Sequence, residues 1–476
     1  GVSPRVIMFT VRPRASRFRS NPLLYKKGDR TDPRNYRPIT LLQNAYKIFT
    51  RVVARRMKTV IHEVIAECQK GFTPHAFIAE CSMLMNMVEA YMNDEDHPER
   101  GNLMIFLDME KAFDRVSHDF LLQAAEAVGF GPRFLRTIRM MYGEASPPKR
   151  RIYANGHYSK WFPVQSGVAQ GCPLSPLLFL LVAQALYVAV EQSDFQGTKI
   201  GGRQIKLSLF ADDASLFPAG PSQLPHMEAL LAKWGRATGM RENMKKRQGL
   251  ATGKYRRRAR RKKLPKSVDW IPEGSWAIVL GAPVGNDMDH DRWWKKKLIA
   301  TQGKTQRFIA LFRASYFGRN LIVQTKYFGA LRYWLYSMPM GKTIRLQVKD
   351  DADTLWWSRT PDLFAPRTRI RRFVARNTAI GPTELGGLNT MDWDSHVTAV
   401  MAEWILRFIR PPDEGVAMWK HVMHTMVLVD KRGHDKFPEG KAIFLCDLSI
   451  ANKLRLMRGI PRKPRMLKSV SAPFLN

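Results

Sequence analysis

The stretch "LFADDASLF", Leu209–Phe217, places two adjacent aspartates between apolar residues. Carboxylates rarely occur inside apolar strands unless another group compensates their charge. The alternation that leads into this stretch predicts a β-hairpin whose tip lies at residues 211–214. Neighbouring side chains of a strand point to opposite faces, but the turn of the hairpin brings Asp212 and Asp213 near one point.

A third aspartate follows a second apolar stretch. The sequence "GNLMIFLDMEKAFDRVSHDFLLQAAEAVGF" predicts a buried strand at Leu103–Leu107, then a loop, and then a helix that ends at Gly129. If this strand lies beside the hairpin, Asp108 faces Asp212, and carboxylates so close repel each other unless a cation separates them. Magnesium suits such a site because it takes hard oxygen ligands and leaves room for phosphate oxygens. Two ions, Mg²⁺ or alternatively Mn²⁺, lower the barrier for in-line attack on a phosphate, whereas a lone aspartate pair is more often two unrelated surface acids.

A glycine-rich turn opens a long apolar helix in "SGVAQGCPLSPLLF", Ser166–Phe179. Gly167 and Gly171 allow the backbone to approach a ligand closely, and a helix N-terminus favours an anion. Gln170 can offer its amide to a base pair or a sugar, although an ordinary loop-to-helix junction has the same sequence pattern. The apolar run Pro173–Val190 is short of a membrane span, so we expect a buried core helix and no membrane partner.

Composition narrows the class of protein further. A chain of 476 residues exceeds one usual core, and a hydrophobic content of 45% excludes disorder over most of its length. The net charge of +36 implies a polyanionic partner, either nucleic acid or an anionic membrane. The four cysteines are scattered without zinc spacing, which favours a reduced, intracellular setting. The chain begins with Gly1 and has no secretory signal, so we expect a fragment of a longer product.

Basic residues are mixed with apolar or aromatic ones in several segments. The run "KYRRRARRKK", Lys254–Lys263, is of a kind that is usually solvated and often disordered; the alternatives are nucleic-acid contact and nuclear localisation. "RWWKKK" and "LWWSR", at Arg292–Lys297 and Leu355–Arg359, either stack on bases or bury their tryptophans. A helix within residues 35–65 is predicted with an apolar face formed by Leu42, Ala45, Ile48, Phe49, Val52 and Val53.

The order of these motifs resembles that of a known family. "FLDMEKAFDRVSH", "SGVAQGCPLSPLLF" and "LFADDASLF" resemble motifs A, B and C of reverse transcriptases. Upstream, "LLYKKGDRTDPRNYRPITLLQNAYKIFTRVVARRM" and "CQKGFTPHAFIAECSMLMNMVEAY" are similar to the finger motifs of non-LTR (LINE-type) retrotransposon enzymes. Downstream, "GRATGMRENMKK" and "VLGAPVG" resemble motifs D and E, and post-palm segments continue the resemblance to Ile409. An ordered set of this kind is far more specific than a single motif.

The resemblance implies roles around the aspartates. Asp108 and Asp212 match the two metal-binding aspartates, while Asp213 matches the second acid, which supports the site and binds metal at some steps. Phe113 matches a bulky gate that would clash with a ribose 2′-OH and so select dNTPs; core packing is a compatible role. Phe210 replaces the commoner tyrosine, so its ring can pack near the primer end but cannot donate a hydroxyl hydrogen bond.

Further positions match residues that bind the incoming nucleotide. Gln170 and Gly171 match the turn that contacts the templating pair. Lys26 and Arg37 match basic finger positions that hold the triphosphate, and bidentate phosphate pairing would suit an arginine. Lys27 is a close rival to its neighbour because the loop alignment is loose.

Motif D carries a candidate proton donor. Lys246 matches the lysine that would protonate the leaving pyrophosphate, and Lys245 is the adjacent rival. Departures from the family include Ala169, where relatives often carry arginine, and the basic run between motifs D and E. Neither removes a catalytic carboxylate. No nuclease and no Cys/His zinc knuckle is recognised, so the polymerase portion alone is expected.

The resemblance implies an α+β fold with the right-hand architecture of polymerases: fingers, a palm with an antiparallel sheet, and a helical thumb. The expected division is an N-terminal extension with fingers (1–100), a palm (101–290) with an inserted fingers segment (about 130–165) and the basic run (254–263), a helical thumb and post-palm region (291–410), and a basic C-terminal tail region (411–476).

The expected function is that of a LINE-type reverse transcriptase, an RNA-directed DNA polymerase in which a primer 3′-OH attacks the α-phosphate of a dNTP. Its partners would be an RNA template, a DNA primer or target, and dNTPs, in the nucleus and cytoplasm; the sequence leaves the oligomeric state open. One alternative is a catalytically inactive, retroelement-derived protein that binds nucleic acid, against which the intact Asp108, Asp212 and Asp213 argue. Another is an RNA-dependent RNA polymerase, which Phe113 and the "FADD" sequence disfavour.

Overall fold

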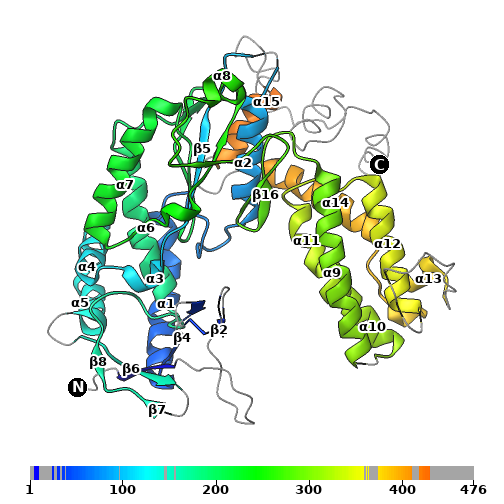
Figure 1. The fold of residues 1–476 in the computed structure, drawn as a ribbon. Helices are drawn as coiled ribbons and strands as arrows, with labels where there is room; N and C mark the ends of the chain where they lie inside the picture. The colour runs from blue at the N-terminus through cyan, green and yellow to red at the C-terminus, as the bar shows by residue number, and fades with distance from the viewer. Residues whose placement is uncertain are drawn as a thin grey trace. The chain divides into compact units, whose positions relative to one another are not determined.

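The structure of the chain is a computed structural model (Figure 1). It describes residues 5–9, 24–25, 29, 31–32, 35–37, 39–95, 97–143, 147–154, 157–312, 314–358, 361, 363, 374–409 and 417–428. The chain divides into two compact units, one formed by Gly1–Cys81 with Glu99–Trp270 and the other by Ser82–Pro98 with Ile271–Asn476. The predicted division into fingers, palm, thumb and tail stays a prediction.

The first unit combines helices with a central sheet and smaller strand groups. Its helices are α1 (Asn44–Val64), α3 (Ala112–Arg115), α4 (His118–Ala127), α5 (Pro132–Tyr142), α6 (Ser175–Glu191), α7 (Leu224–Thr238) and α8 (Arg258–Arg261), with short 3-10 helices η2 (Pro221–Gln223), η3 (Met244–Lys246) and η4 (Gly253–Arg256). Its strands are β1 (Arg5–Phe9), β2 (Leu24–Tyr25), β3 (Tyr36–Arg37), β4 (Ile39–Leu41), β5 (Leu103–Leu107), β6 (Lys149–Ala154), β7 (His157–Tyr158), β8 (Phe162–Pro163), β9 (Thr198–Ile200), β10 (Arg203–Ile205), β11 (Leu207–Phe210), β12 (Asp213–Leu216), β13 (Gln248–Ala251) and β14 (Asp269–Trp270).

The central sheet carries the candidate site. Among the described residues its strand order is β11-β12-β5-β13-β14, and the pairings are antiparallel except for the parallel pairing of β13 with β14. The middle strand, β5, is buried along its whole length because its five residues are apolar on both faces. Its bounds are those predicted from the sequence, and the α+β class is confirmed, with β14 as a parallel addition to the expected antiparallel sheet.

Helix α6 accounts for the apolar run that approaches the length of a membrane span. Most of its side chains are buried, and it packs with α4 and α7 in the core of the first unit. The polar residue in its middle, Gln184, accepts a hydrogen bond at Oε1 from Ala66 N (2.8 Å). Within the described part of the chain, no helix combines the length and the apolar character needed to cross a membrane.

The second unit is largely helical. Its helices are α2 (Ala79–Met92, which begins in the first unit), α9 (His290–Phe312), α10 (Tyr316–Ile322), the π-helix η5 (Val323–Phe328), α11 (Gly329–Leu335), α12 (Lys342–Trp357), α13 (Arg376–Ile380), η6 (Thr383–Leu385), α14 (Trp393–Ile409) and α15 (Met418–Leu428). A short hairpin joins β15 (Ala277–Val279) to β16 (Ala282–Val284). The tryptophans of both predicted aromatic–basic segments lie in these helices, in α9 and α12.

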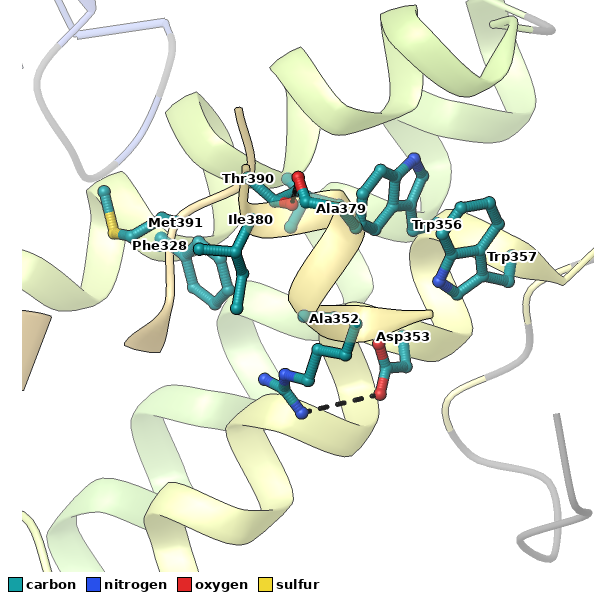
Figure 2. A pocket seen from close by; sticks show the side chains of 11 residues that line it. Phe328, Ala352, Asp353, Trp356, Trp357, Ala379, Ile380, Thr390 and Met391 are labelled. Carbon is teal, nitrogen blue, oxygen red and sulfur yellow. Dashed lines mark hydrogen bonds and ion pairs between the residues drawn. The ribbon is translucent and has the colours of Figure 1, made fainter. Parts of the chain in front are cut away.

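Those tryptophans are core residues. Trp293 and Trp294 are fully buried in α9, and the neighbouring pair Trp356 and Trp357 in α12 is also buried. The latter pair lines a pocket of about 30 Å³, where Asp353 contacts Arg376 at 3.8 Å between Oδ2 and Nη1 (Figure 2). A volume of this size admits only a water molecule or two. Burial in helices, rather than base stacking, is therefore the role that the structure gives these tryptophans.

Helix α1 buries a different face from the predicted one. Its buried residues are Thr50, Ala54, Met57 and Ile61, whereas Ile48 is 65% exposed. The sequence has apolar residues on both faces of this helix, and the face with Ala54, Met57 and Ile61 packs onto the core. The predicted apolar face was therefore wrong for Ala45, Ile48, Phe49 and Val52, which are exposed, whereas Leu42 is buried and Val53 packs against the core.

Candidate active site

The register of the central sheet brings two of the aspartates to one edge. Ala214 of β12 pairs with Leu107 of β5, so Asp213 and Asp108 are the next residues outward on adjacent antiparallel strands. Asp213 also closes the β11–β12 hairpin opposite Phe210, which leaves Asp212 in the two-residue turn. Asp213 is exposed, and the Asp108 side chain is 36% exposed, so this edge is open to solvent.

A lysine reaches this edge from the segment after α7. Asn243 N donates to Asp108 O (2.8 Å), which holds the following turn, η3, beside the end of β5. From that turn, Lys246 Nζ donates to Asp108 Oδ2 at 2.6 Å. The adjacent Lys245 is exposed. The geometry therefore places Lys246, and not its rival, against the candidate catalytic carboxylate.

The η3 turn is held by a buried ion-pair network. The Arg247 guanidinium is almost completely buried and donates from Nε and Nη2 to the two carboxylate oxygens of Glu242, at 2.7 and 2.6 Å. Its Nη1 also donates to Glu228 of α7 (2.8 Å). These bonds tie both ends of the turn to one guanidinium and to a neighbouring helix. They fix the position from which Lys246 extends toward Asp108.

The donor atoms at this edge suit a hard dication, but they do not form a complete cage. Among the described residues, no group of three or more histidine, cysteine, aspartate or glutamate side chains is arranged to hold a metal ion. In this structure the Lys246 ammonium supplies the positive charge at Asp108. Carboxylate oxygens are the ligands that Mg²⁺ prefers, so the chemistry of the residues fits the ion. The predicted metal roles of Asp108, Asp212 and Asp213 stay predictions.

A residue that the sequence analysis did not single out supports the aspartate turn. Cys68–Phe72, here called the 68–72 segment, runs beside β11, with Lys70 N donating to Leu209 O (2.9 Å). The Gln69 side chain is 1% exposed, and its Oε1 accepts hydrogen bonds from the backbone N–H groups of Ala211 and Gly71, both at 2.8 Å. Its Nε2 donates to Ala211 O (3.3 Å). The amide thus binds both backbone polar groups of the residue that precedes Asp212.

These bonds matter because the turn is strained. Ala211 has a φ of +58°, a left-handed conformation that costs about 1 kcal/mol or more for a residue with a Cβ. Gly71 lies so close that a Cβ at its position would be 2.2 Å from Ala211 N. Only glycine allows this approach of the two backbones. The quoted "CQKGF" motif contained both Gln69 and Gly71, but nothing local in it indicated that they contact the hairpin.

The 68–72 segment also touches the predicted sugar gate. The Phe72 ring meets the Phe113 ring edge to face, with centroids 6.2 Å apart and an interplanar angle of 84°. On its other side, Phe113 stacks on Phe179 of α6 at 5.1 Å and 7°. Phe113 is half-buried in α3, so core packing is observed, and a role as a gate stays a prediction.

The predicted nucleotide-contacting turn adopts the conformations that its glycines permit. Gly167 and Gly171 have φ values of +88° and +107°, and a Cβ on Gly167 would lie 2.6 Å from Asp114 O. Gln170 Nε2 donates to Asp114 Oδ1 (3.2 Å), and Gln170 O accepts from Thr40 N (2.9 Å). Burial raises the pKa of Asp114. The amide of Gln170 is therefore held beside α3, on the same segment as Phe113.

His118 anchors the same turn from the start of α4. It is the first residue of that helix, and its buried Nε2 donates to Gly167 O (2.9 Å). Burial lowers the pKa of His118 below its ordinary value of 6.5. The neutral imidazole is thus the form that the folded chain prefers.

This shift predicts a pH-dependent stability. A proton binds His118 more tightly in the unfolded chain than in the folded chain. The contribution of neutral His118 to the free energy of unfolding is therefore complete above about pH 6.5 and is lost as the pH falls toward the folded pKa. Burial lowers the pKa of His290 and His396 in the same direction. We expect urea unfolding to give a smaller free energy at pH 5.5 than at pH 7.5, and His118→Gln to reduce this slope. An unchanged slope in the variant would contradict the assignment.

Two predicted triphosphate ligands lie where the structure does not describe side chains. Lys26, like its rival Lys27, is outside the described residues. Arg37 belongs to β3, where its backbone pairs with Leu24, but its side chain is not described. Phe210 is the last residue of β11 and is half-buried beside the aspartate turn.

Comparison with known proteins identifies the region that carries the site. Residues 25–271 match the family model described as reverse transcriptase (RNA-dependent DNA polymerase). The chain is 31% identical over 235 residues to the transposon TX1 uncharacterized 149 kDa protein of Xenopus laevis, covering 48% of this chain and 17% of that protein. It is 29% identical over 225 residues to the Pol polyprotein of the type-1 retrotransposable element R2 of Popillia japonica, covering 47% and 30%. It is 26% identical over 216 residues to the RNA-directed DNA polymerase from mobile element jockey of Drosophila melanogaster, covering 44% and 22%.

The matches to solved structures are more distant. Apo telomerase of Candida tropicalis, truncated from its C-terminal domain, is 12% identical with a TM-score of 0.34, covering 46% of this chain and 48% of that chain. Telomerase of Candida albicans in complex with a TWJ fragment of telomeric RNA is 10% identical with a TM-score of 0.36, covering 78% and 60%. The chain spans between 17% and 30% of the length of the three curated relatives named above.

Proposed function

The chain belongs to the reverse transcriptase family, with relatives among non-LTR retrotransposon polyproteins, and from this premise we propose that it extends a DNA primer on an RNA template using dNTPs. The observation that supports this most directly is the shared edge of β5 and β12, where Asp108 and Asp213 emerge on either side of the strand pairing and Asp212 occupies the turn. We also propose that two metal ions take part in this reaction and that the RNA template is the longer of its nucleic-acid partners. The protein would act inside the cell, in the nucleus and cytoplasm.

The carboxylates would hold the metal ions. In this proposal Asp108 and Asp212 are the principal ligands, and Asp213 supports them from the exposed end of β12. Two Mg²⁺ ions, when bound, would supply a lowered pKa for the primer hydroxyl and charge compensation for the leaving pyrophosphate. The Lys246 ammonium, now paired with Asp108, would then be released to face that pyrophosphate as a proton donor.

The aromatic and amide side chains would choose the nucleotide. Phe113 is fixed between Phe72 and Phe179, so its ring cannot rotate away from a sugar that approaches it. Gln170 is fixed on the same segment by its bond to Asp114 and would contact the templating pair. The net charge of +36 suits a partner that is held through its phosphate backbone.

Primer extension tests the proposal against its rivals. The full chain, with an RNA template and an annealed DNA primer, should incorporate dNTPs and not NTPs when Mg²⁺ is supplied. Incorporation of NTPs would support an RNA-dependent RNA polymerase instead. A folded chain that binds the duplex but incorporates neither would support the inactive, nucleic-acid-binding alternative.

Phe113→Val predicts a loss of sugar selection. Shortening the ring removes the clash with a 2′-OH, and differences of a few methylene groups in an apolar pocket change discrimination by roughly 10- to 200-fold. We expect the ratio of kcat/KM for dNTP over NTP to fall about 20-fold in primer extension, with dNTP use itself nearly unchanged. Phe134→Val, which shortens a partly buried aromatic side chain of α5 in the same unit, is the matched control. Equal ratios in both variants would contradict the gate.

A further inference from the structure

The basic segment Lys254–Lys263 is the most concentrated charge in the chain that the proposed reaction does not use. Eight of its ten residues are lysine or arginine. Between Thr252 and Val268 there is no aspartate or glutamate. Blocks of like charge usually stay disordered because they repel one another. A fold that holds like charges close together needs local contacts that anchor its backbone. Binding of an external polyanion would stabilise it further.

The structure supplies the anchors. The segment forms η4 and α8, with Arg260 N donating to Arg257 O at 3.0 Å. Just before it, Thr252 N donates to Asn102 O (3.0 Å), and the Thr252 hydroxyl donates to the same oxygen. Tyr255 packs partly buried against the core. The charges are therefore displayed on a folded backbone.

The segment lies at the end of the sheet opposite to the aspartates. β13 is antiparallel to β5, and its last residue, Ala251, pairs with Leu103, the first residue of β5. Asp108 follows the other end of β5, about 16 Å away for a five-residue strand. Figure 1 shows α8 beyond one end of β5 and α3, which follows Asp108, beyond the other. The segment therefore cannot contact a phosphate that is reacting at the aspartates.

Among the side chains of this segment that the structure describes, four cations are exposed. The exposed side chains are those of Arg257, Arg260, Lys262 and Lys263. We propose that the segment is a second, separate RNA-binding surface, which holds single-stranded template RNA by its phosphates outside the duplex at the aspartates. The inference rests on the proposed function. In that reaction the RNA template has its full length from the first step, whereas the DNA product has not yet been made, so the RNA is the strand that the segment would bind. Contacts of this kind need charge and no base recognition.

The fold disfavours a targeting role for the same residues. A receptor that reads a basic peptide in an extended form needs a backbone that is free to extend. Here the segment is compacted into helical turns between the Thr252 hydrogen bonds and Leu264, which is buried in the core. RNA phosphates can be bound from a folded surface without such unfolding.

The test compares two fourfold substitutions in the full chain. One variant carries Arg257→Gln, Arg260→Gln, Lys262→Gln and Lys263→Gln, and the matched control replaces four other exposed cations of the first unit, Arg133, Arg136, Lys233 and Arg236, by glutamine. A third variant, Arg257→Lys with Arg260→Lys, keeps the charge and should behave as the unmodified chain. The probes are a blunt primer–template duplex of about 12 base pairs and the same duplex with a single-stranded RNA extension of about 40 nucleotides, longer than one site of this kind occupies.

We expect the first variant to bind the extended RNA at least tenfold more weakly than the control, with a salt slope smaller by about 2 to 3, because each lost phosphate contact removes about 0.7. Its affinity for the blunt duplex should match that of the control. Equal affinity of variant and control for the extended RNA would overturn the proposal, and so would an equal loss on the blunt duplex. These binding measurements remain informative even if no variant incorporates dNTPs, so failure of the proposed function is told apart from failure of this inference.

Discussion

Asp212→Asn is expected to lower the rate of dNTP incorporation about a thousandfold while leaving the fold and the affinity for RNA unchanged. The substitution keeps the size of the side chain but removes the negative charge that would bind metal. Compensation of phosphate charge by metal ions is worth several kcal/mol in the transition state, and each 1.36 kcal/mol is a factor of ten. Because Asp212 occupies the turn at the exposed edge of the sheet, little core packing depends on it. The measurement is kcat for single-nucleotide extension at saturating primer–template.

Asp194→Asn is the matched control, since this aspartate is exposed in the same unit and lies in the loop after α6, away from the turn. It should keep the full rate. Asp213→Asn measures how much the second acid contributes to the rate of incorporation. Its pairing opposite Phe210 places this residue on β12 rather than in the turn. Undiminished incorporation by Asp212→Asn would remove the aspartate edge from the proposed mechanism.

The elements that carry the aspartates could be predicted because their causes are local. β5 is a run of five apolar residues, which fits a strand buried on both faces, and the hairpin follows from alternation and a turn. Asp108 follows directly from the end of β5. The α+β class, by contrast, was predicted from the resemblance to reverse transcriptases and not from a local pattern.

Other features depend on tertiary packing that no local pattern encodes. Helix α1 has apolar residues on two faces, so periodicity could not tell that Ala54 and Met57 face the core while Ile48 faces solvent. The choice between Lys245 and Lys246 depends on the pairing of Asn243 with the end of β5, 135 residues away in sequence. Whether the basic segment is folded depends on contacts made by residues other than its charged ones.

Gln69 is the clearest case of a functional contact hidden from the sequence. It lies 142 residues before Ala211, yet its amide binds both backbone polar groups of that residue. We expect Gln69→Leu to lower kcat about a hundredfold, because displacement of a reacting group by about 1 Å can cost that much. The change also leaves three buried backbone groups without their partner. Each such group costs about 1–3 kcal/mol, so the first unit should lose about 3 kcal/mol or more of its free energy of unfolding.

A purely structural role of Gln69 would also lower the free energy of unfolding. The two roles are told apart by whether kcat falls in addition to the stability. Gln302→Leu is the matched control: this glutamine is equally buried in the second unit, where its Nε2 donates to Asp351 Oδ2 (2.6 Å). It should lose comparable stability but keep kcat when measured at a temperature where both variants are folded. Because Gln69 holds the strained Ala211 in place and does not itself contact substrate, its variant should lose kcat with little change in KM. A variant that is destabilised yet keeps its full kcat would show that the left-handed turn holds Asp212 in place without the glutamine.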